Sequence, residues 1–292
     1  MKIWPGVATI VLALSAQAAE LKPETLKAWD QYVEEANARM QERLHDGGKF
    51  LWIDESPERG RQVREGRIIA APMAPHMPMR VQGGLIHHWI GAAFLPNVKM
   101  ENVLSTVRDY PRYKEIYAPT VIESKARQRT DVEDRFSMVM MNKSFLMKRA
   151  LDSEYQSTYV KLDGRRWYST SSTTRVQEIE DYGQAGEHRL PLNEGSGYIW
   201  RLHAITRFQE TDNGVFVEVE GMALSRDIPA AVRFMVDPIV RRVSKGSVTT
   251  SLKQTEDAIS NGVISNASVQ ASAGPKGSQA GTAAKSIQTF RQ

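Results

Sequence analysis

The chain has 292 residues, of which 41% are hydrophobic and 25% charged, a composition typical of a globular protein with a substantial core. Its formal net charge of +4 is small for this length, and the basic residues are interspersed with acidic ones, which argues against a nucleic-acid-binding protein. The sequence contains no cysteine, which excludes disulfide bonds, thiol catalysis and thiolate metal ligands.

The amino terminus, residues 1–19, has the pattern of a secretory signal peptide. A positive residue precedes an apolar run, residues 7–14, that is too short to cross a bilayer. The small-x-small motif at residues 16–18 is a cleavage site, so we expect an exported protein, periplasmic or secreted, that begins at Ala19 or Glu20. An uncleaved anchor is the alternative, which the cleavage motif disfavours.

Residues 20–82 are predicted to form a helical extension followed by a proline-rich connector. Apolar residues recur every three to four positions from Leu26 to Leu44, and Gly47-Gly48 follows where a helix usually ends. Residues 54–82 carry several charges and then three prolines in quick succession, which predicts an extended connector.

Most of residues 83–260, the predicted main domain, has the pattern of strands. Apolar and polar residues alternate in these segments, β-branched residues are enriched, and turn-forming residues lie at their ends. Two short helical segments, residues 98–108 and 112–117, follow the first strand, and residues 181–197 form a long polar loop. The predicted strands are residues 85–95, 120–127, 135–141, 155–162, 167–179, 198–208 and 215–220.

A long amphipathic helix is predicted from residue 227 to residue 260. Asp227 is a suitable N-cap, and apolar residues recur at helical spacing. Pro238 removes a backbone hydrogen bond, so we expect a bend or break within about one turn of it, with Val236 and Ile239 facing the sheet. Beyond it, residues 261–292 are poor in apolar residues, which predicts a disordered tail.

This order of elements, with Asp109-Tyr110-Pro111-Arg112-Tyr113 between the two short helices, resembles the START-like superfamily over residues 83–259. That helix-grip fold is shared by lipid-transfer START domains, polyketide cyclase-like proteins and coenzyme Q-binding proteins. The resemblance implies an α+β fold, in which a curved antiparallel sheet of about six to seven strands wraps around the long helix. It also implies an apolar cavity between them, where members bind lipids, sterols, aromatic polyketides or quinones. The superfamily shares no catalytic motif that could be carried over.

Apolar positions of several strands are predicted to line that cavity, because alternate residues of a strand face the same side of a sheet. Methionine is adaptable filling for an irregular pocket. The same residues would equally build a closed core, and the sequence leaves both interpretations open. The predicted ligand-binding residues are Trp89, Phe136, Met138, Met140, Tyr198, Trp200, Leu202, Val217, Val236 and Ile239.

Other polar residues offer no clear catalytic or metal site. His87 and His88 are strand neighbours that point to opposite faces, so they do not chelate one ion together. His203 is expected to face outward, with Arg201 and Arg207. The hydroxyl run of residues 169–174 places three hydroxyls on each face, where one set would orient a polar ligand head. No Gly-x-Ser-x-Gly motif occurs, and we predict no catalytic residue, metal or cofactor.

Three functional hypotheses follow. The first is an exported binding or carrier protein for a hydrophobic small molecule such as a lipid, sterol or quinone, in transient contact with membranes. The second is a cyclase- or hydrolase-like enzyme that uses a buried histidine, His87 or His88, with a carboxylate partner in the same cavity. The third is a partner-binding module with a closed core, in which the N-terminal helix or the tail carries the function.

Overall fold

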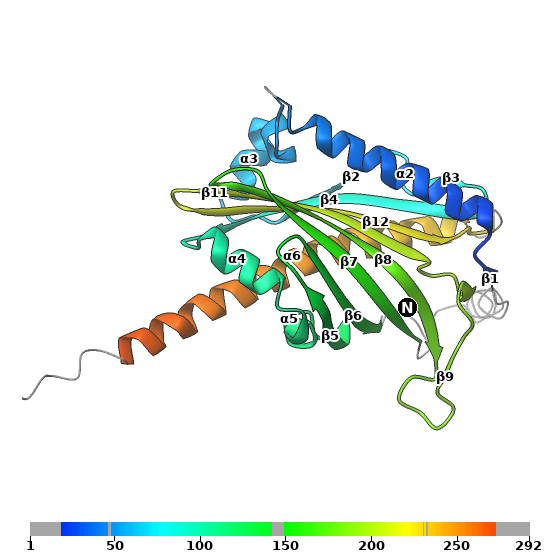
Figure 1. The fold of residues 1–292 in the computed structure, drawn as a ribbon. Coiled ribbons are helices and arrows are strands. Elements are labelled where there is room, and N and C mark those ends of the chain that lie inside the picture. Colours follow the sequence, from blue (N-terminus) through cyan, green and yellow to red (C-terminus); the bar gives the residue numbers. More distant parts are fainter. Residues whose placement is uncertain (1–18, 46–47, 142–148, 230, 232, 273–292) are drawn as a thin grey trace, which may run out of the picture.

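One large antiparallel sheet forms the centre of the computed structural model (Figure 1), which describes residues 19–45, 48–141, 149–229, 231 and 233–272. The fold is α+β, as predicted, and the sheet has ten strands because three short ones join the seven long ones. The predicted signal peptide up to residue 18 and the predicted tail from residue 273 lie outside the described residues. Along the sheet, the strands are β2 (Ile69–Pro72), β4 (Gly84–Pro96), β12 (Gly214–Arg226), β11 (Arg201–Thr211), β8 (Arg166–Glu180), β7 (Ala150–Lys161), β6 (Glu133–Met141) and β5 (Val121–Arg129).

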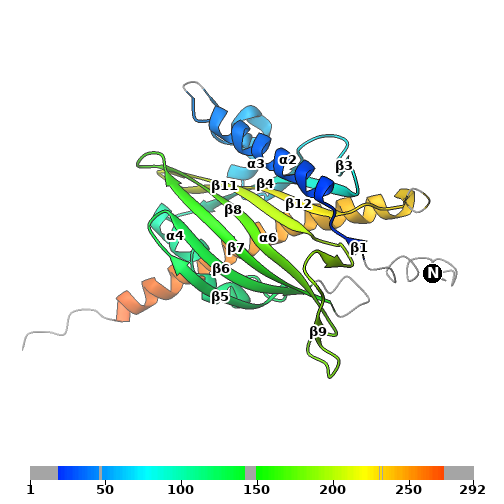
Figure 2. The same cartoon turned by 45° about the vertical axis from the view of Figure 1, so that its right-hand side comes forward.

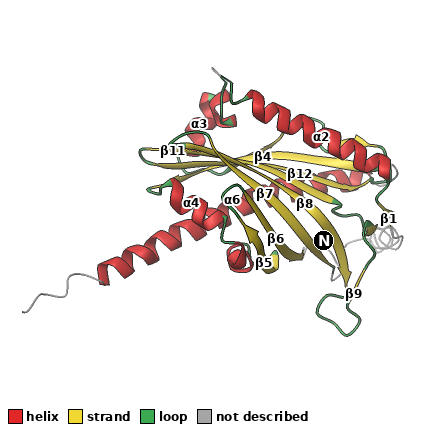
Figure 3. Ribbon diagram, in the orientation of Figure 1, coloured by secondary structure: helices red, strands yellow, loops and turns green. Residues whose placement is uncertain are grey.

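Helices cover the sheet on both faces (Figures 1 and 3), and we name each face after its main helix, the α2 face and the α6 face. The turned view separates the N-terminal helices on one side from α6 on the other (Figure 2). On the α2 face lie α2 (Pro23–Glu42), η1 (Trp52–Glu55) and α3 (Pro57–Arg64); on the α6 face lie α4 (Met100–Val107), η2 (Tyr110–Arg112), α5 (Tyr113–Ile116) and α6 (Arg233–Ser272).

The α2 face is a closed core. Helix α2 begins with a proline in its first turn and buries Trp29, Ala36 and Met40, which share one side of the helix. They belong to one cluster with Ile205 of β11 and other apolar residues of the sheet. Burial of this much apolar surface is the main stabilising term for such a layer.

Trp200 also belongs to this α2-face cluster, so the predicted shared face of Trp200 and Leu202 is wrong. Strand β11 begins at Arg201, and Trp200 precedes it. Gly197, with φ of 68°, turns the chain just before, in a conformation that favours glycine. Strict alternation therefore applies from Arg201 onward and not before it.

The α6 face is packed where α6 crosses β4. Leu252 and Ile259 of the helix are buried, in one cluster with Val217 and Phe208 of the sheet. A Cβ atom on Gly91 would lie 2.6 Å from Val248 Cγ1, so the absence of a side chain there permits the close approach of helix and strand.

Several predictions for α6 need correction. The helix begins at Arg233, not Asp227, because the Asp227 carboxylate accepts from Ile228 N and pairs with Arg80. It continues without a break through Pro238, whose lost hydrogen bond falls close to the helix start. Ile239 is 61% exposed and does not face the sheet, because the helix meets the sheet further on, at Val248 and beyond. Residues 261–272, predicted to be disordered, are helical and project past the sheet (Figure 1).

The predicted extended connector, residues 54–82, also differs. Ser56 accepts a hydrogen bond from Arg59 N and Pro57 occupies the first turn, a combination that begins helix α3. Further on, β2 and β3 (Met79–Val81) pair with β4, because that strand offers a free edge. The polar loop of residues 181–197 holds two more short strands: β9 (His188–Arg189), paired with β8, and β10 (Glu194–Gly195), paired with β1 (Ala19–Glu20).

Candidate ligand-binding site

The α6 face stays partly open over the middle of the sheet. On β11, a central strand, Ile205 is 0% and Arg207 1% exposed on the α2 face. The intervening residues Leu202, Ala204 and Thr206, which point toward the α6 face, are only half-buried. Helix α6 lies mainly over β4, β2 and β12, so these side chains of β11 stay partly accessible.

An aromatic cluster, defined as Tyr110, Tyr113, Phe136 and Tyr155, borders this open region. Phe136 stacks on Tyr110 with ring centroids 4.1 Å apart and on Tyr155 at 4.9 Å, and Tyr113 meets Tyr110 edge-on at 5.3 Å. Met138, Met140 and Leu202 pack against the cluster and are half-buried. The cluster therefore joins η2, α5, β6, β7 and β11 into one apolar, partly accessible wall.

A buried ion pair anchors the cluster. The Asp134 carboxylate, 0% exposed, accepts from Arg108 Nε and Nη2 at 2.8 Å each and from the Tyr110 hydroxyl at 2.8 Å. The Arg108 guanidinium lies over the Tyr159 ring, 4.7 Å from its centroid. The Asp134 charge is thus satisfied by a bidentate partner, and it is not available to a ligand.

The tyrosines of this region are neutral hydroxyls. Burial raises the pKa of Tyr110, Tyr113 and Tyr155, and it raises the pKa of Tyr159 to about 12. At neutral pH they donate hydrogen bonds and do not act as bases.

The structure brings together four of the predicted ligand-binding residues: Phe136, Met138, Met140 and Leu202. Val217 and Trp89 are buried, Val217 in the core under α6 and Trp89 on β4, and Tyr198 is half-buried ahead of β11. Val236 and Ile239 lie in the first turns of α6, where Val236 is half-buried and Ile239 exposed.

The tyrosines were not predicted as site residues from the sequence, although the strand pattern already places two of them on one face. Tyr155 and Tyr159 alternate with Ser157 along one predicted strand, which puts both rings on one face. Tyr110 and Tyr113 were noted for the superfamily resemblance alone.

His87 and His88 point to opposite faces, as predicted. His87 lies on the α6 face with its Nε2 2.8 Å from the Ser225 hydroxyl, and burial lowers the pKa of His87 to about 4. His88 lies on the α2 face, between the Tyr32 hydroxyl at 2.7 Å and Glu220 at 2.9 Å. The histidine–carboxylate pair expected of an enzyme is therefore on the other side of the sheet from the open region.

The outward position predicted for His203 and Arg207 is wrong, because α2 covers that side. His203 is 4% exposed, with Asn37 Oδ1 at 3.1 Å and the Ser172 hydroxyl at 2.7 Å. Arg207 is ion-paired with Glu220 and lies 3.6 Å from Glu218. The polar and charged side chains on this side of β11 therefore contact other parts of the protein and not water.

Glu218 ties the N-terminal segment to the sheet. Its carboxylate accepts from Trp52 N at 2.8 Å and from Ile53 N at 2.9 Å. Burial raises the pKa of Glu218, whereas Arg207 and these two backbone donors lower it. The network of Tyr32, His88, Glu220, Arg207 and Glu218 is thus a structural element beneath the helices.

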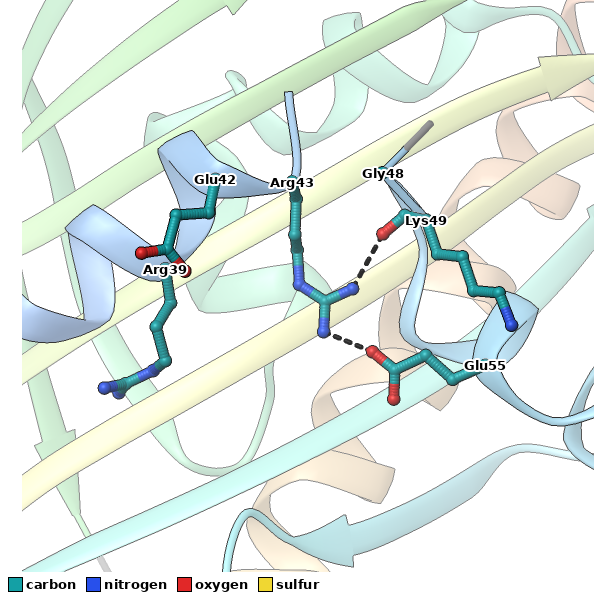
Figure 4. A pocket seen from close by; sticks show the side chains of 6 residues that line it. All are labelled: Arg39, Glu42, Arg43, Gly48, Lys49 and Glu55. Carbon is teal, nitrogen blue, oxygen red and sulfur yellow. Dashed lines mark hydrogen bonds and ion pairs between the residues drawn. The ribbon is translucent and has the colours of Figure 1, made fainter. Parts of the chain in front are cut away.

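Two surface pockets of about 400 Å³ lie away from the α6 face. Arg39, Glu42, Arg43, Gly48, Lys49 and Glu55 line the first, at the end of α2 (Figure 4). There Arg43 donates to Lys49 O at 2.8 Å and pairs with Glu55 at 2.5 Å, so its charge is already used. The second lies between the hairpin ends at residues 163–166 and 209–211.

Within the described residues, no group of three or more histidine, aspartate or glutamate side chains is arranged to hold a metal ion. No helix in the same part of the chain is both long and apolar enough to cross a membrane.

Comparison with known proteins finds similarity of fold. No family model and no curated protein matches the chain. A STAR-related lipid transfer protein fragment from Xanthomonas axonopodis is 18% identical, over 65% of this chain and 98% of its own, with a TM-score of 0.42. Human STARD10 is 11% identical, over 74% and 83%, with a TM-score of 0.45. The Zhui aromatase/cyclase from Streptomyces sp. R1128 is 11% identical, over 59% and 94%, with a TM-score of 0.34. These are likenesses of fold, and the α+β arrangement that the START-like resemblance implied, a large antiparallel sheet with a long C-terminal helix, is what this structure has.

Proposed function

We propose that the protein is exported and carries a hydrophobic small molecule on the α6 face, between the aromatic cluster and α6. One observation carries the proposal. The central strand β11 buries His203, Ile205 and Arg207 on one side and leaves Leu202 and Ala204 only half-buried on the other. Exposed apolar surface costs roughly 25 cal/mol per Å², so a ligand that covers this wall gains that free energy.

The chemistry of the wall favours binding over catalysis. The tyrosine pKa values are raised, and burial lowers the pKa of His87 to about 4. Neither group is matched to proton transfer near neutral pH, where a catalytic acid or base is most effective. The half-buried Met138 and Met140 side chains adapt to ligands of irregular shape.

Export is supported by the signal-peptide pattern of residues 1–19. Ala19 and Glu20, the predicted first residues of the mature chain, pair as β1 with β10. Cleavage after Ala18 would leave this pairing intact.

Transient membrane contact is supported by the start of α6. Phe234 is 75% and Ile239 61% exposed there, and Arg241 and Arg242 follow within one turn of Ile239. Exposed apolar side chains beside cations are typical of helices that touch a lipid surface.

The proposal predicts that protein purified from the exporting host contains an extractable hydrophobic molecule. Organic extraction and mass spectrometry identify it in the wild-type protein. Ala204→Trp fills the open wall and reduces the recovered ligand at least about tenfold, because the new ring occupies the space over β11.

Val132→Trp is the matched control, since it adds the same ring at a position that is 65% exposed, and it retains the ligand. Circular dichroism first establishes that both variants are folded. An empty wild-type protein, or a full ligand load in Ala204→Trp, contradicts the proposal.

A further inference from the structure

We infer that the ligand carries an uncharged polar group, a hydroxyl or a carbonyl, that binds a strip of hydroxyls on β7, β8 and β11. This inference rests on the proposed function, and it adds the chemical class of the ligand. The strip is defined as Ser157, Ser169, Ser171 and Thr206.

The strand register places the strip in the open region. Thr206 is the direct cross-strand partner of Ser169, and Ser171 is that of Ser157. Phe208 pairs with Trp167 one step along the same face, and both belong to the α6-face core. All four hydroxyl residues therefore point to the α6 face.

The strip has unused hydrogen-bonding capacity. Ser157 donates to Ser171 Oγ at 2.7 Å, which leaves the Ser171 hydrogen free. Within the described part of the chain, neither Ser169 nor Thr206 has a hydrogen-bond partner for its hydroxyl. Ser169 is nevertheless only 6% exposed. The Ser169 hydroxyl oxygen is not among the fully buried side-chain atoms that lack a partner, so it stays accessible from the open region, where a ligand hydroxyl or carbonyl could bond it.

The other face of the same strands shows the contrast. There Thr158 and Thr170 bond each other at 2.7 Å, and Ser172 bonds His203 at 2.7 Å. Unpaired hydroxyls are thus a feature of the open side and not of the hydroxyl run as a whole.

The charges around the strip favour a neutral group. On the α6 face, Arg108 is held by Asp134 in a bidentate pair, and Lys161 is exposed at the end of β7, over the Trp167 ring. Arg207 is buried on the opposite face. A carboxylate or phosphate at the strip would be a buried charge without a buried cation, which is far more costly than a buried alcohol.

The test uses three probes that share one pyrene-labelled twelve-carbon chain and differ in the end group. They are pyrenedodecanol, pyrenedodecanoic acid and the methyl ester of that acid. Pyrene fluorescence at pH 8, where the acid is ionised, gives each dissociation constant for the full mature chain. We expect the alcohol and the ester to bind at least about tenfold more tightly than the carboxylate.

Ser169→Ala/Thr206→Val removes the two free hydroxyls, and it weakens alcohol binding about five- to tenfold. Thr158→Val/Thr170→Val makes a matched change on the other face and alters alcohol binding less than about twofold. If all three probes bind equally and neither pair of substitutions matters, the inference is wrong while the carrier function stands. If no probe binds the wild-type chain, both are wrong.

Discussion

Buried histidines show how the face of a strand decides the chemistry of a single residue. His203 lies beneath α2 and His87 on the α6 face, and burial lowers the pKa of each to about 4, from an ordinary value of 6.5. In the unfolded chain each of these histidines binds a proton below about pH 6.5, whereas in the folded protein it stays neutral down to about pH 4. Each histidine therefore lowers stability as the pH falls through this window.

We predict that the free energy of unfolding falls by about 2 kcal/mol for each of these histidines between pH 7 and pH 5. His203→Gln keeps a polar side chain near Asn37 and Ser172 but cannot titrate, so it removes one such contribution. Urea unfolding at both pH values measures the difference. An unchanged pH dependence in His203→Gln would show that His203 is not held neutral.

At the scale of elements, the contact of α6 with β4 depends on a missing side chain. A Cβ atom added to Gly91 would lie 2.6 Å from Val248 Cγ1 and 3.0 Å from Leu252 Cδ1. The strand and the helix therefore approach more closely than a side chain at position 91 would allow. Apolar periodicity indicated the helix, but this fit between distant segments is a property of their packing.

We expect Gly91→Val to destabilise the protein by about 1–3 kcal/mol, because the added methyl groups push α6 from the sheet. Gly246→Ala in the same helix is the control. Nothing lies within 4 Å of its added Cβ, so it stabilises by up to about 1 kcal/mol. Thermal unfolding compares the two, and equal effects would rule out close packing at Gly91.

At the scale of the whole molecule, one sheet serves two different layers. Its α2 face is sealed by the N-terminal segment, which Glu218 holds through Trp52 and Ile53. Its α6 face is only partly covered and holds the proposed ligand site. The residues after the predicted signal peptide are therefore a structural part of the folded body.

We predict that the exported chain has the intact mass of a polypeptide that begins at Ala19 or Glu20, because the motif at residues 16–18 suits signal peptidase. Mass spectrometry of protein recovered outside the cytoplasm checks this. A chain that lacks residues 2–18 is the control and stays in the cytoplasm. Recovery of the unprocessed mass from the membrane fraction would instead favour an uncleaved anchor.

The sequence by itself determined the features that depend on neighbouring residues. Period-two and helical patterns located the seven long strands and α2, and they placed His87 and His88 on opposite faces. The order of these elements was enough to indicate an α+β fold with a large antiparallel sheet and a long C-terminal helix.

Only the tertiary structure decided what covers each face. Alternation says that His203 and Leu202 point in opposite directions, but not that α2 buries the first and that nothing fully covers the second. The aromatic cluster likewise gathers rings from segments far apart in the chain. Periodicity is a local property, whereas burial arises from packing between distant elements, and the ligand site is defined by where that packing is incomplete.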